Sequence, residues 1–416
     1  MEIADSLRFV IVGHIDHGKS TLIGRLFYDT DSLPDEKIEE VRAICESLGR
    51  EMEFAYVMDH LEEERTQGIT IDTTQTFFKT DKRDYVIIDA PGHREFTKNM
   101  ITGASQAEAA ILIVDAEEGV QEQTRRHAYI LGLLGLEQVI VVINKMDLVD
   151  FSEERYMEVS KDITGFLYQI NTKPTYVIPI SAKEGDNIAS RSGRMTWYSG
   201  PIILEALDSF RSLEDRIDRP LRFPVQDVYQ IGNKRIIVGR IEAGAIEEGQ
   251  DILVLPTGEV TTVSSVEEYN NVNKRKAVSG ESTGIIVKDK LFIDRGNVIT
   301  VPVNKPVMSN EIKANVFWMD KEPLKKGETV SFKCSTQEAK CLVKTIERRI
   351  DSSTLELIEV DAEVLENREV GEVVLNFTNQ IIVDNFNDTP ELGRFVIEKK
   401  LDTAGGGIIT DLGERS

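Results

Sequence analysis

The segment that most constrains the fold is residues 13–20, Gly-His-Ile-Asp-His-Gly-Lys-Ser, which fits the pattern G-x-x-x-x-G-K-[ST]. Residues 8–13, which lead into it, are mostly apolar with three β-branched residues, as in a buried strand, and residues 21–26 after it have a helical pattern. A glycine-rich turn between a strand and a helix points backbone N–H groups inward and adds the positive end of the helix dipole. The segment therefore predicts a phosphate-binding loop, with Lys19 at the β- and γ-phosphates and the Ser20 hydroxyl on Mg²⁺. The residues expected around the phosphates are Gly13, His14, Ile15, Asp16, His17, Gly18, Lys19, Ser20 and Thr21.

Four further apolar runs lie in the first half of the chain, at residues 84–89, 109–115, 138–144 and 176–181. Near-continuous Val and Ile runs, separated by helix-length connections, indicate a parallel sheet covered on both faces. In doubly wound sheets, ligands bind at the carboxyl edge of the strands. We therefore expect an α/β domain with a doubly wound, mostly parallel sheet and a phosphate loop at that edge.

The run at residues 84–89 leads into Asp89-Ala90-Pro91-Gly92. A carboxylate at this strand end can face the magnesium ion through a water molecule, and the Gly92 N–H can approach the γ-phosphate. Taken alone, the same four residues could be an ordinary exit from a strand into a turn. Together with the phosphate loop, they predict Asp89 and Gly92 as part of the nucleotide site.

Residues 144–147, Asn-Lys-Met-Asp, indicate which base is bound. The Asp147 carboxylate can accept two hydrogen bonds from N1–H and N2–H₂ of guanine, whereas adenine would leave it unpaired. Ser181-Ala182-Lys183 follows the next strand and is placed to add a backbone contact to the base, although these three residues alone are a weak signal. The order of the motifs predicts GTP with Mg²⁺, and adds Asn144, Lys145, Asp147, Ser181, Ala182 and Lys183 to the expected GTP-binding residues.

The second half of the chain has a different pattern. Residues 222–229, 235–242 and 251–255 are short alternating runs separated by turn residues, and residues 218–220 have the composition of a linker. A second break falls at residues 302–306, after which the β-type pattern resumes. Two β-barrels after the α/β domain are the simplest architecture, with domains at residues 1–213, 219–303 and 305–416.

The net charge of −23 and the pI of about 4.8 argue against nucleic-acid binding, which normally needs a basic face. No run of apolar residues is long enough to span a membrane, and no secretion signal is visible at the N-terminus, so we expect a cytoplasmic protein. The spacing of Cys45, Cys334 and Cys341 fits neither a zinc site nor a disulfide framework, which predicts small buried side chains.

These motifs together resemble the translation-factor class of GTPases, a resemblance that also covers residues 64–72 and 98–105. The resemblance implies that Thr70 closes over Mg²⁺ when the γ-phosphate is present, and that His93 orients the attacking water. The catalytic residues would then be His93, Thr70 and Lys19, and the metal would be held by Ser20, Thr70 and, through water, Asp89. The resemblance also implies that Asp16 holds charge near the β–γ bridge, and that Ile15 and Ile69 form an apolar gate. Without it, His93 would be a solvated turn histidine and the isoleucines core residues.

Within this class, the barrel half most resembles the GTPase (large) subunit of sulfate adenylyltransferase. The resemblance lies in residues 222–228, 254–258, 292–299, 348–356, 393–397 and 404–409. It implies a heteromeric complex in which a smaller catalytic subunit makes adenylylsulfate from ATP and sulfate, driven by GTP hydrolysis. His17 in the phosphate loop and residues 92–96 instead resemble elongation factor one-alpha, whose partners would be aminoacyl-tRNA or a release factor and the ribosome. No second phosphate loop follows residue 300, so we expect no fused adenylylsulfate kinase.

Overall fold

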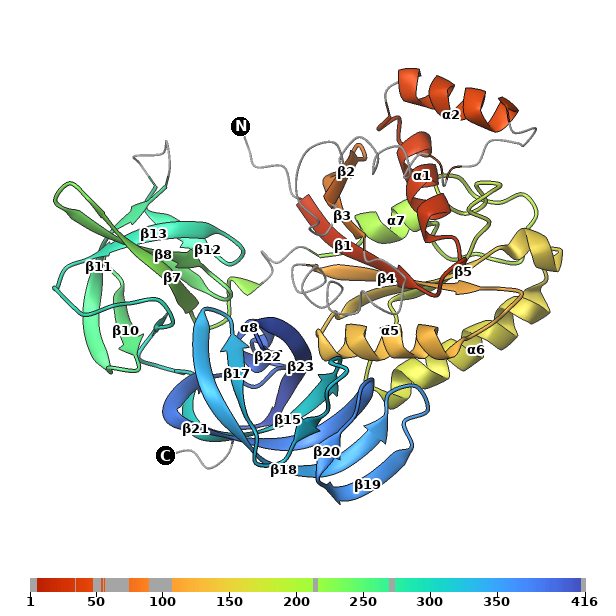
Figure 1. Ribbon diagram of the computed structural model, residues 1–416. Helices are drawn as coiled ribbons and strands as arrows, with labels where there is room; N and C mark the ends of the chain where they lie inside the picture. The colour runs from red at the N-terminus through yellow and green to blue at the C-terminus, as the bar shows by residue number, and fades with distance from the viewer. Residues whose placement is uncertain are drawn as a thin grey trace. The chain divides into compact units, whose positions relative to one another are not determined.

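The computed structural model describes residues 6–33, 35–47, 54, 56, 75–89, 107–211, 216–268 and 274–412 (Figure 1). The chain divides into two units, Met1–Ser212 and Leu213–Ser416. Thr70, Gly92, His93 and Ile69 lie outside the described residues.

The first unit is built on a six-stranded sheet with the order β2-β3-β1-β4-β5-β6. Its strands are parallel except for β2, which pairs antiparallel with β3. β1 lies between β3 and β4, so its carboxyl end, where the phosphate loop begins, is at the centre of the sheet edge. The strands are β1 (Ser6–Gly13), β2 (Gln75–Lys79), β3 (Asp84–Asp89), β4 (Ala109–Asp115), β5 (Gln138–Asn144) and β6 (Tyr176–Pro179).

Helices cover both faces of this sheet (Figure 1). One face packs in a core with α1 and α7, and the opposite face contacts α5 and α6. This explains why the strands are apolar at consecutive positions: every residue of β4 is buried, alternately toward one face and the other. The helices are α1 (Lys19–Asp29), α2 (Asp35–Ser47), α5 (Glu122–Leu133), the 3₁₀ helix η1 (Met146–Val149), α6 (Glu153–Gln169) and α7 (Ile203–Asp208).

The second unit begins with a closed six-stranded barrel in the order β10-β11-β13-β8-β7-β14, filled by side chains such as Phe223 and Ile237. A separate two-stranded sheet joins β9 and β12. The strands are β7 (Arg222–Ile231), β8 (Lys234–Arg240), β9 (Ala245–Glu247), β10 (Asp251–Leu255), β11 (Glu259–Glu267), β12 (Lys276–Val278), β13 (Ser282–Val287) and β14 (Val298–Thr300).

The remaining strands form a seven-stranded sheet, β17-β22-β23-β15-β21-β18-β19, in which β17 also pairs with β18. Six strands therefore close a ring around Trp318, Phe332 and the buried Cys334 and Cys341, with β19 outside the ring. A two-stranded sheet joins β16 and β20. The elements are β15 (Val307–Trp318), β16 (Leu324–Lys325), β17 (Thr329–Cys334), β18 (Gln337–Asp351), β19 (Leu357–Ala362), β20 (Val364–Leu365), β21 (Glu369–Val383), α8 (Pro390–Gly393), β22 (Arg394–Lys399) and β23 (Asp402–Asp411).

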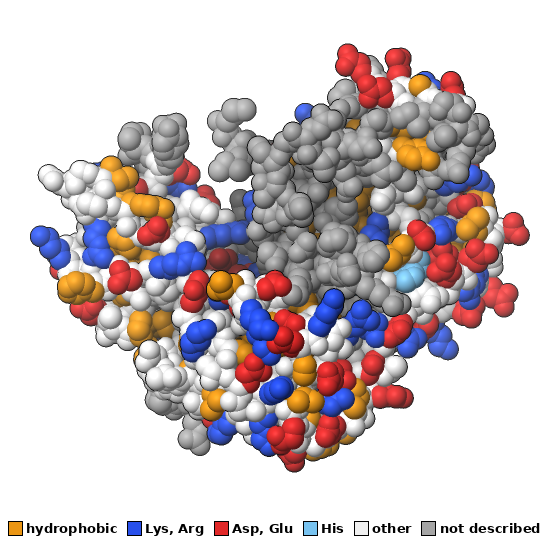
Figure 2. All heavy atoms as spheres, viewed as in Figure 1, with side chains coloured by type: hydrophobic (Ala, Val, Ile, Leu, Met, Phe, Trp, Pro, Cys, Tyr) orange, Lys and Arg blue, Asp and Glu red, His pale blue; other side chains and the backbone are white. Residues whose placement is uncertain are grey.

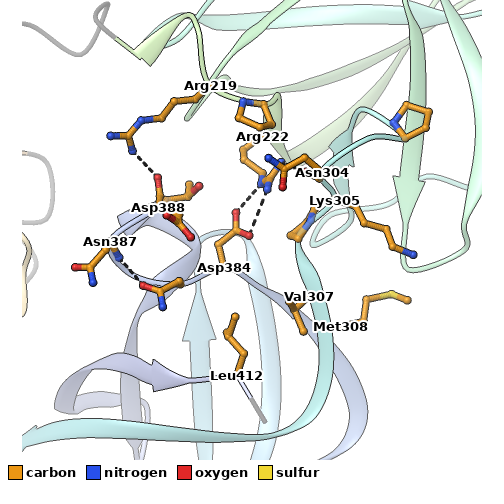
Figure 3. Close-up of a pocket in the computed structure, with 15 residues that line it drawn as sticks. Arg219, Arg222, Asn304, Lys305, Val307, Met308, Asp384, Asn387, Asp388 and Leu412 are labelled. Atoms are coloured by element: carbon orange, nitrogen blue, oxygen red, sulfur yellow. Dashed lines mark hydrogen bonds and ion pairs between the residues drawn. The ribbon is translucent and has the colours of Figure 1, made fainter. Parts of the chain in front are cut away.

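A buried ion pair joins the two barrels (Figure 3). Arg222 at the start of β7 donates to the Asp384 carboxylate, with Nε–Oδ2 at 2.5 Å and Nη2–Oδ1 at 3.3 Å. Its Nη1 group donates to Thr300 Oγ1 and to the Asn304 carbonyl, so the guanidinium is hydrogen-bonded on all sides. The pair borders a polar pocket of about 850 Å³ between the barrels, lined also by Lys305.

The predicted fold class is confirmed: an α/β phosphate-loop domain precedes β-barrel structure. The sequence did not predict β2, and the expected strand at residues 176–181 ends earlier, at Pro179. The three cysteines are buried. Among the described helices, none is long and apolar enough to cross a membrane.

Candidate nucleotide-binding site

Two glycines give the phosphate loop its shape. A Cβ on Gly13 would lie 2.8 Å from the Ile113 carbonyl of β4, and a Cβ on Gly18 would lie 2.4 Å from Asn144 Nδ2. Gly18 also has φ +91°, a conformation that L side chains rarely adopt, and it caps the N-terminus of α1. Any side chain at these positions would push the loop away from β4 and β5.

Lys19 is the first residue of α1, and its side chain turns back into the loop. Its Nζ donates to the Gly13 carbonyl at 3.1 Å and to the His14 carbonyl at 3.3 Å. The ammonium is thus held inside the turn, next to the N-terminus of α1, where the helix dipole also favours anions. Ser20 and Thr21 follow in the first turn and are half-buried.

Two buried histidines near the phosphate loop, His17 and His127, have lowered pKa values. His17 is fully buried, with Nδ1 3.4 Å from the Ile113 carbonyl and Nε2 3.3 Å from Glu118 Oε2. Burial lowers the pKa of His17. Burial and the nearby Lys19 ammonium lower the pKa of His127, on α5, to about 3. Because burial holds both pKa values below the ordinary value of histidine, neither of these two rings adds positive charge near pH 7.

One side chain connects the phosphate loop to the expected base site. Asn144, the last residue of β5, donates from Nδ2 to the His17 carbonyl at 2.9 Å, and its Oδ1 accepts the Ala182 N–H at 2.9 Å. The structure therefore brings together three motifs that are more than thirty residues apart in sequence. Because both hydrogen bonds are buried, the amide fixes the distance between the phosphate end and the base end of the site.

Asp147 lies in η1 and is oriented by the segment that follows β6. Ser181 Oγ donates to Asp147 Oδ1 at 2.6 Å, and the same hydroxyl accepts the Glu184 N–H at 3.1 Å. The carboxylate is half-buried, and a hydrogen bond from the Met146 N–H to the Ile180 carbonyl anchors its loop. Lys183, two residues after Ser181, is exposed.

Family models match both ends of the chain: Elongation factor Tu GTP binding domain over residues 4–220, and GTP-eEF1A C-terminal domain-like over residues 311–410. Elongation factor 1-alpha of Natronomonas pharaonis is 38% identical to this chain, over 97% of each protein. The chain belongs to the elongation factor Tu and elongation factor 1-alpha family of GTPases. Sulfate adenylyltransferase subunit 1 of Sulfurovum sp. (strain NBC37-1) is 37% identical, over 100% of this chain and 89% of that protein. Among solved structures, sup35 complexed with GDP is similar with a TM-score of 0.47 and 24% identity, over 99% of this chain and 95% of that one.

Membership in this GTPase family makes GTP the nucleotide of the site. The relatives named elongation factor 1-alpha and sulfate adenylyltransferase subunit 1 have similar identities to this chain, so identity alone does not separate the two branches.

The residue types predicted to hold magnesium, a serine and an aspartate, suit that ion. Ser20 lies next to Lys19 in α1, and the backbone of Asp89 at the end of β3 pairs with Ile11 of β1, two residues before the loop. Hydroxyl and carboxylate oxygens are the hard ligands that Mg²⁺ prefers. In nucleotide sites the ion takes few ligands from the protein, and phosphates and waters provide the others. Among the described residues, no three His, Cys, Asp or Glu side chains converge on a metal site.

Asp115, which the sequence motifs did not predict, forms an ion pair with the predicted site residue Lys145. It ends β4, beside Asn144 in the sheet, and its Oδ2 lies 2.7 Å from Lys145 Nζ. Burial by itself would raise the pKa of Asp115, but the Lys145 ammonium and the N–H groups of Glu117 and Glu118 outweigh it, and the pKa is lowered. Its position could have marked it, because Asp115 is a polar residue at the carboxyl end of a buried strand, next to β5.

Proposed function

We propose that this chain is the GTPase subunit of a sulfate adenylyltransferase complex, in which it couples GTP hydrolysis to adenylylsulfate synthesis by a smaller catalytic subunit. The observation that carries the GTP switch is the Asn144 amide, which holds the phosphate loop and the guanine-recognition segment together. The sulfate branch is supported by the barrel segments that resemble that subunit and by a relative with that name that aligns with the whole of this chain.

GTP binding uses two ends of one site. Lys19 and the N-terminus of α1 neutralise the phosphates, while Asp147, oriented by Ser181, accepts the two guanine N–H groups. Magnesium, held by Ser20, Thr70 and, through water, Asp89, would neutralise charge on the β- and γ-phosphates.

The proposed switch responds to the γ-phosphate. Thr70 and the segment after Gly92 order around that phosphate, and His93 orients the water that attacks it. Release of phosphate frees both segments. The partner subunit binds the GTP-ordered state and transfers AMP from ATP to sulfate, with loss of pyrophosphate, and hydrolysis drives this unfavourable synthesis forward.

Charge supports a protein partner over a nucleic acid. The net charge is −23, and in Figure 2 the Lys and Arg side chains on the visible face are interspersed with Asp and Glu. On the second barrel, basic side chains form ion pairs with neighbouring glutamates, which reduces their availability to phosphates. Examples are Lys313–Glu347 at 3.2 Å, Lys344–Glu311 at 2.6 Å and Arg348–Glu372 at 2.9 Å.

The second candidate is a translation GTPase that delivers aminoacyl-tRNA or a release factor to the ribosome. It is favoured by relatives named elongation factor 1-alpha with 37–39% identity, which match over nearly their whole length.

One reconstitution separates the two candidates. The chain is mixed with a smaller sulfate adenylyltransferase subunit, ATP and sulfate, and adenylylsulfate is measured with GTP, with GDP and without nucleotide. We expect synthesis to require GTP and to cease with GDP. GTP-independent synthesis, or failure of the two proteins to associate, would contradict the sulfate proposal. Retention of charged tRNA by the GTP-bound chain, lost at raised salt, would support the translation candidate.

A further inference from the structure

A turn at the end of β4 contacts both the base side and the phosphate side of the site. Asp115 is 1% exposed, and its Oδ1 accepts the N–H groups of Glu117 at 2.7 Å and Glu118 at 3.2 Å. Its other oxygen pairs with Lys145 Nζ at 2.7 Å. One oxygen of Asp115 therefore shapes the turn, and the other is directed at Lys145.

The path of the Lys145 side chain follows from the order of the strands. Lys145 directly follows β5, has φ +63° and caps η1, which carries Asp147. Asp115 ends β4, which lies between β5 and the β1 strand that leads into the phosphate loop. The Lys145 stem therefore runs along the carboxyl edge from the base end toward the phosphate end, and it keeps 29% of its surface exposed. A nucleoside between those ends would lie against this stem.

We propose that Asp115 is a positioning residue for GTP binding: its buried carboxylate holds the Lys145 ammonium so that the lysine stem forms part of the surface under the nucleoside. The inference rests on the proposed GTP site and adds a residue that does not itself touch the nucleotide.

The turn that carries Asp115 is fixed from three sides. The Ala116 N–H donates to the Asn144 carbonyl at 2.8 Å, and Arg155 of α6 donates to the carbonyls of Ala116 at 2.7 Å and Glu117 at 2.9 Å. The Glu118 carboxylate lies 3.3 Å from His17 Nε2 in the phosphate loop. A carboxylate held this firmly can orient a flexible lysine before the nucleotide arrives, which reduces the entropy lost on binding.

The test is a double-mutant cycle with Asp115→Asn and Lys145→Met. Asparagine keeps an oxygen for the N–H groups of Glu117 and Glu118 but faces Lys145 without charge, and methionine keeps the stem but removes the ammonium. We expect Asp115→Asn to raise the Kd for fluorescent GDP at least tenfold in wild-type protein, and less than twofold in the Lys145→Met background. Asp162→Asn is the matched control, because Asp162 forms an exposed ion pair with Arg125 in the same unit; it should leave the Kd unchanged.

The outcomes distinguish this inference from the proposed function. If Asp115→Asn leaves the Kd unchanged while Lys145→Met raises it, or if the two losses add in full, Asp115 does not position Lys145 and the GTP site stands. If Asp115→Asn does not fold, the Kd of Lys145→Met is compared with that of the double variant. Equal values support the inference, and a higher Kd for the double variant overturns it. If no member of the cycle changes affinity, both the inference and the proposed place of Lys145 in the GTP site are wrong.

Discussion

The Asp147 carboxylate is the single group expected to choose the base, and its neighbours explain how it can do so. Ser181 Oγ fixes one of its oxygens at 2.6 Å, so the carboxylate is oriented before guanine binds. Preorganised polar groups discriminate strongly, because a base without matching donors leaves them desolvated and unpaired.

Replacing Asp147 with Asn should move selectivity from guanine to xanthine nucleotides. The amide can donate to the C2 carbonyl of xanthine, whereas it opposes the N2 amino group of guanine. Its Oδ1 can still accept from Ser181, so the loop is retained. We expect the affinity for GTP to fall on the order of a hundredfold and that for xanthosine triphosphate to rise, measured by competition with fluorescent GDP. Asp150→Asn is the control, since Asp150 is exposed and its φ of +52° suits Asn. Unchanged selectivity in Asp147→Asn would refute the guanine assignment.

Site residues whose chemistry is local can be recognised from the sequence. The loop from Gly13 to Ser20 forms within one strand–turn–helix segment, so its spacing alone reveals it. Asp115 and Arg155 could not be recognised in this way. Their roles depend on β4 lying next to β5 and on α6 covering that edge, and sequence spacing does not encode either contact.

Among the strands, β23 has a glycine run at residues 405–407 that the barrel geometry requires. It pairs with β15 on one side and β22 on the other. A Cβ on Gly407 would lie 2.5 Å from Phe395 Cζ and 2.7 Å from the Asn315 carbonyl. The glycine therefore lets a buried aromatic ring pack directly onto the strand.

We expect Gly407→Ala to destabilise the second barrel by about 1–3 kcal/mol, because the backbone carbonyl of Asn315 cannot move without breaking the sheet. Trp197 and Trp318 are the two tryptophans of the chain, and Trp318 lies in this barrel. Its fluorescence in a Trp197→Phe background can follow denaturant unfolding. Gly165→Ala, with no atom within 4 Å of its Cβ on helix α6, is the control and should be neutral or slightly stabilising. A midpoint for Gly407→Ala equal to that of the parent would show that the barrel relaxes around the methyl group.

Strands that are buried along their whole length could be predicted, because burial requires a long run of apolar residues. β4 is buried at every position, and its apolar run identified it. β2 has five residues, and its Phe77 is 66% exposed, so neither length nor composition marked it as a strand. β19 is exposed at every position but its last, and it is defined by its pairing with β18.

Several carboxylates and arginines lie close together where the two barrels of the second unit join. Arg216 donates to both oxygens of Glu391, at 3.0 and 3.1 Å. Glu242, just after β8, faces the same charges and is half-buried. Burial and the Glu391 carboxylate raise the pKa of Glu242 to about 7, and the arginines Arg240, Arg394 and Arg216 oppose this rise.

The raised pKa of Glu242 makes stability depend on pH in a direction opposite to that of an ion-paired carboxylate. Between a pKa of about 4.5 in the unfolded chain and about 7 in the folded protein, the unfolded state has lost the proton and the folded state keeps it, so stability falls as pH rises through this window. Glu242→Gln removes that cost. We expect it to stabilise the protein by about 1–3 kcal/mol at pH 8.5 and by much less at pH 5.5, from Trp318-monitored denaturation. Glu259→Gln, at an exposed position at the start of β11 in the same barrel, should show no such difference. An equal gain at both pH values would mean that Glu242 is ionised throughout and that the gain comes from another source.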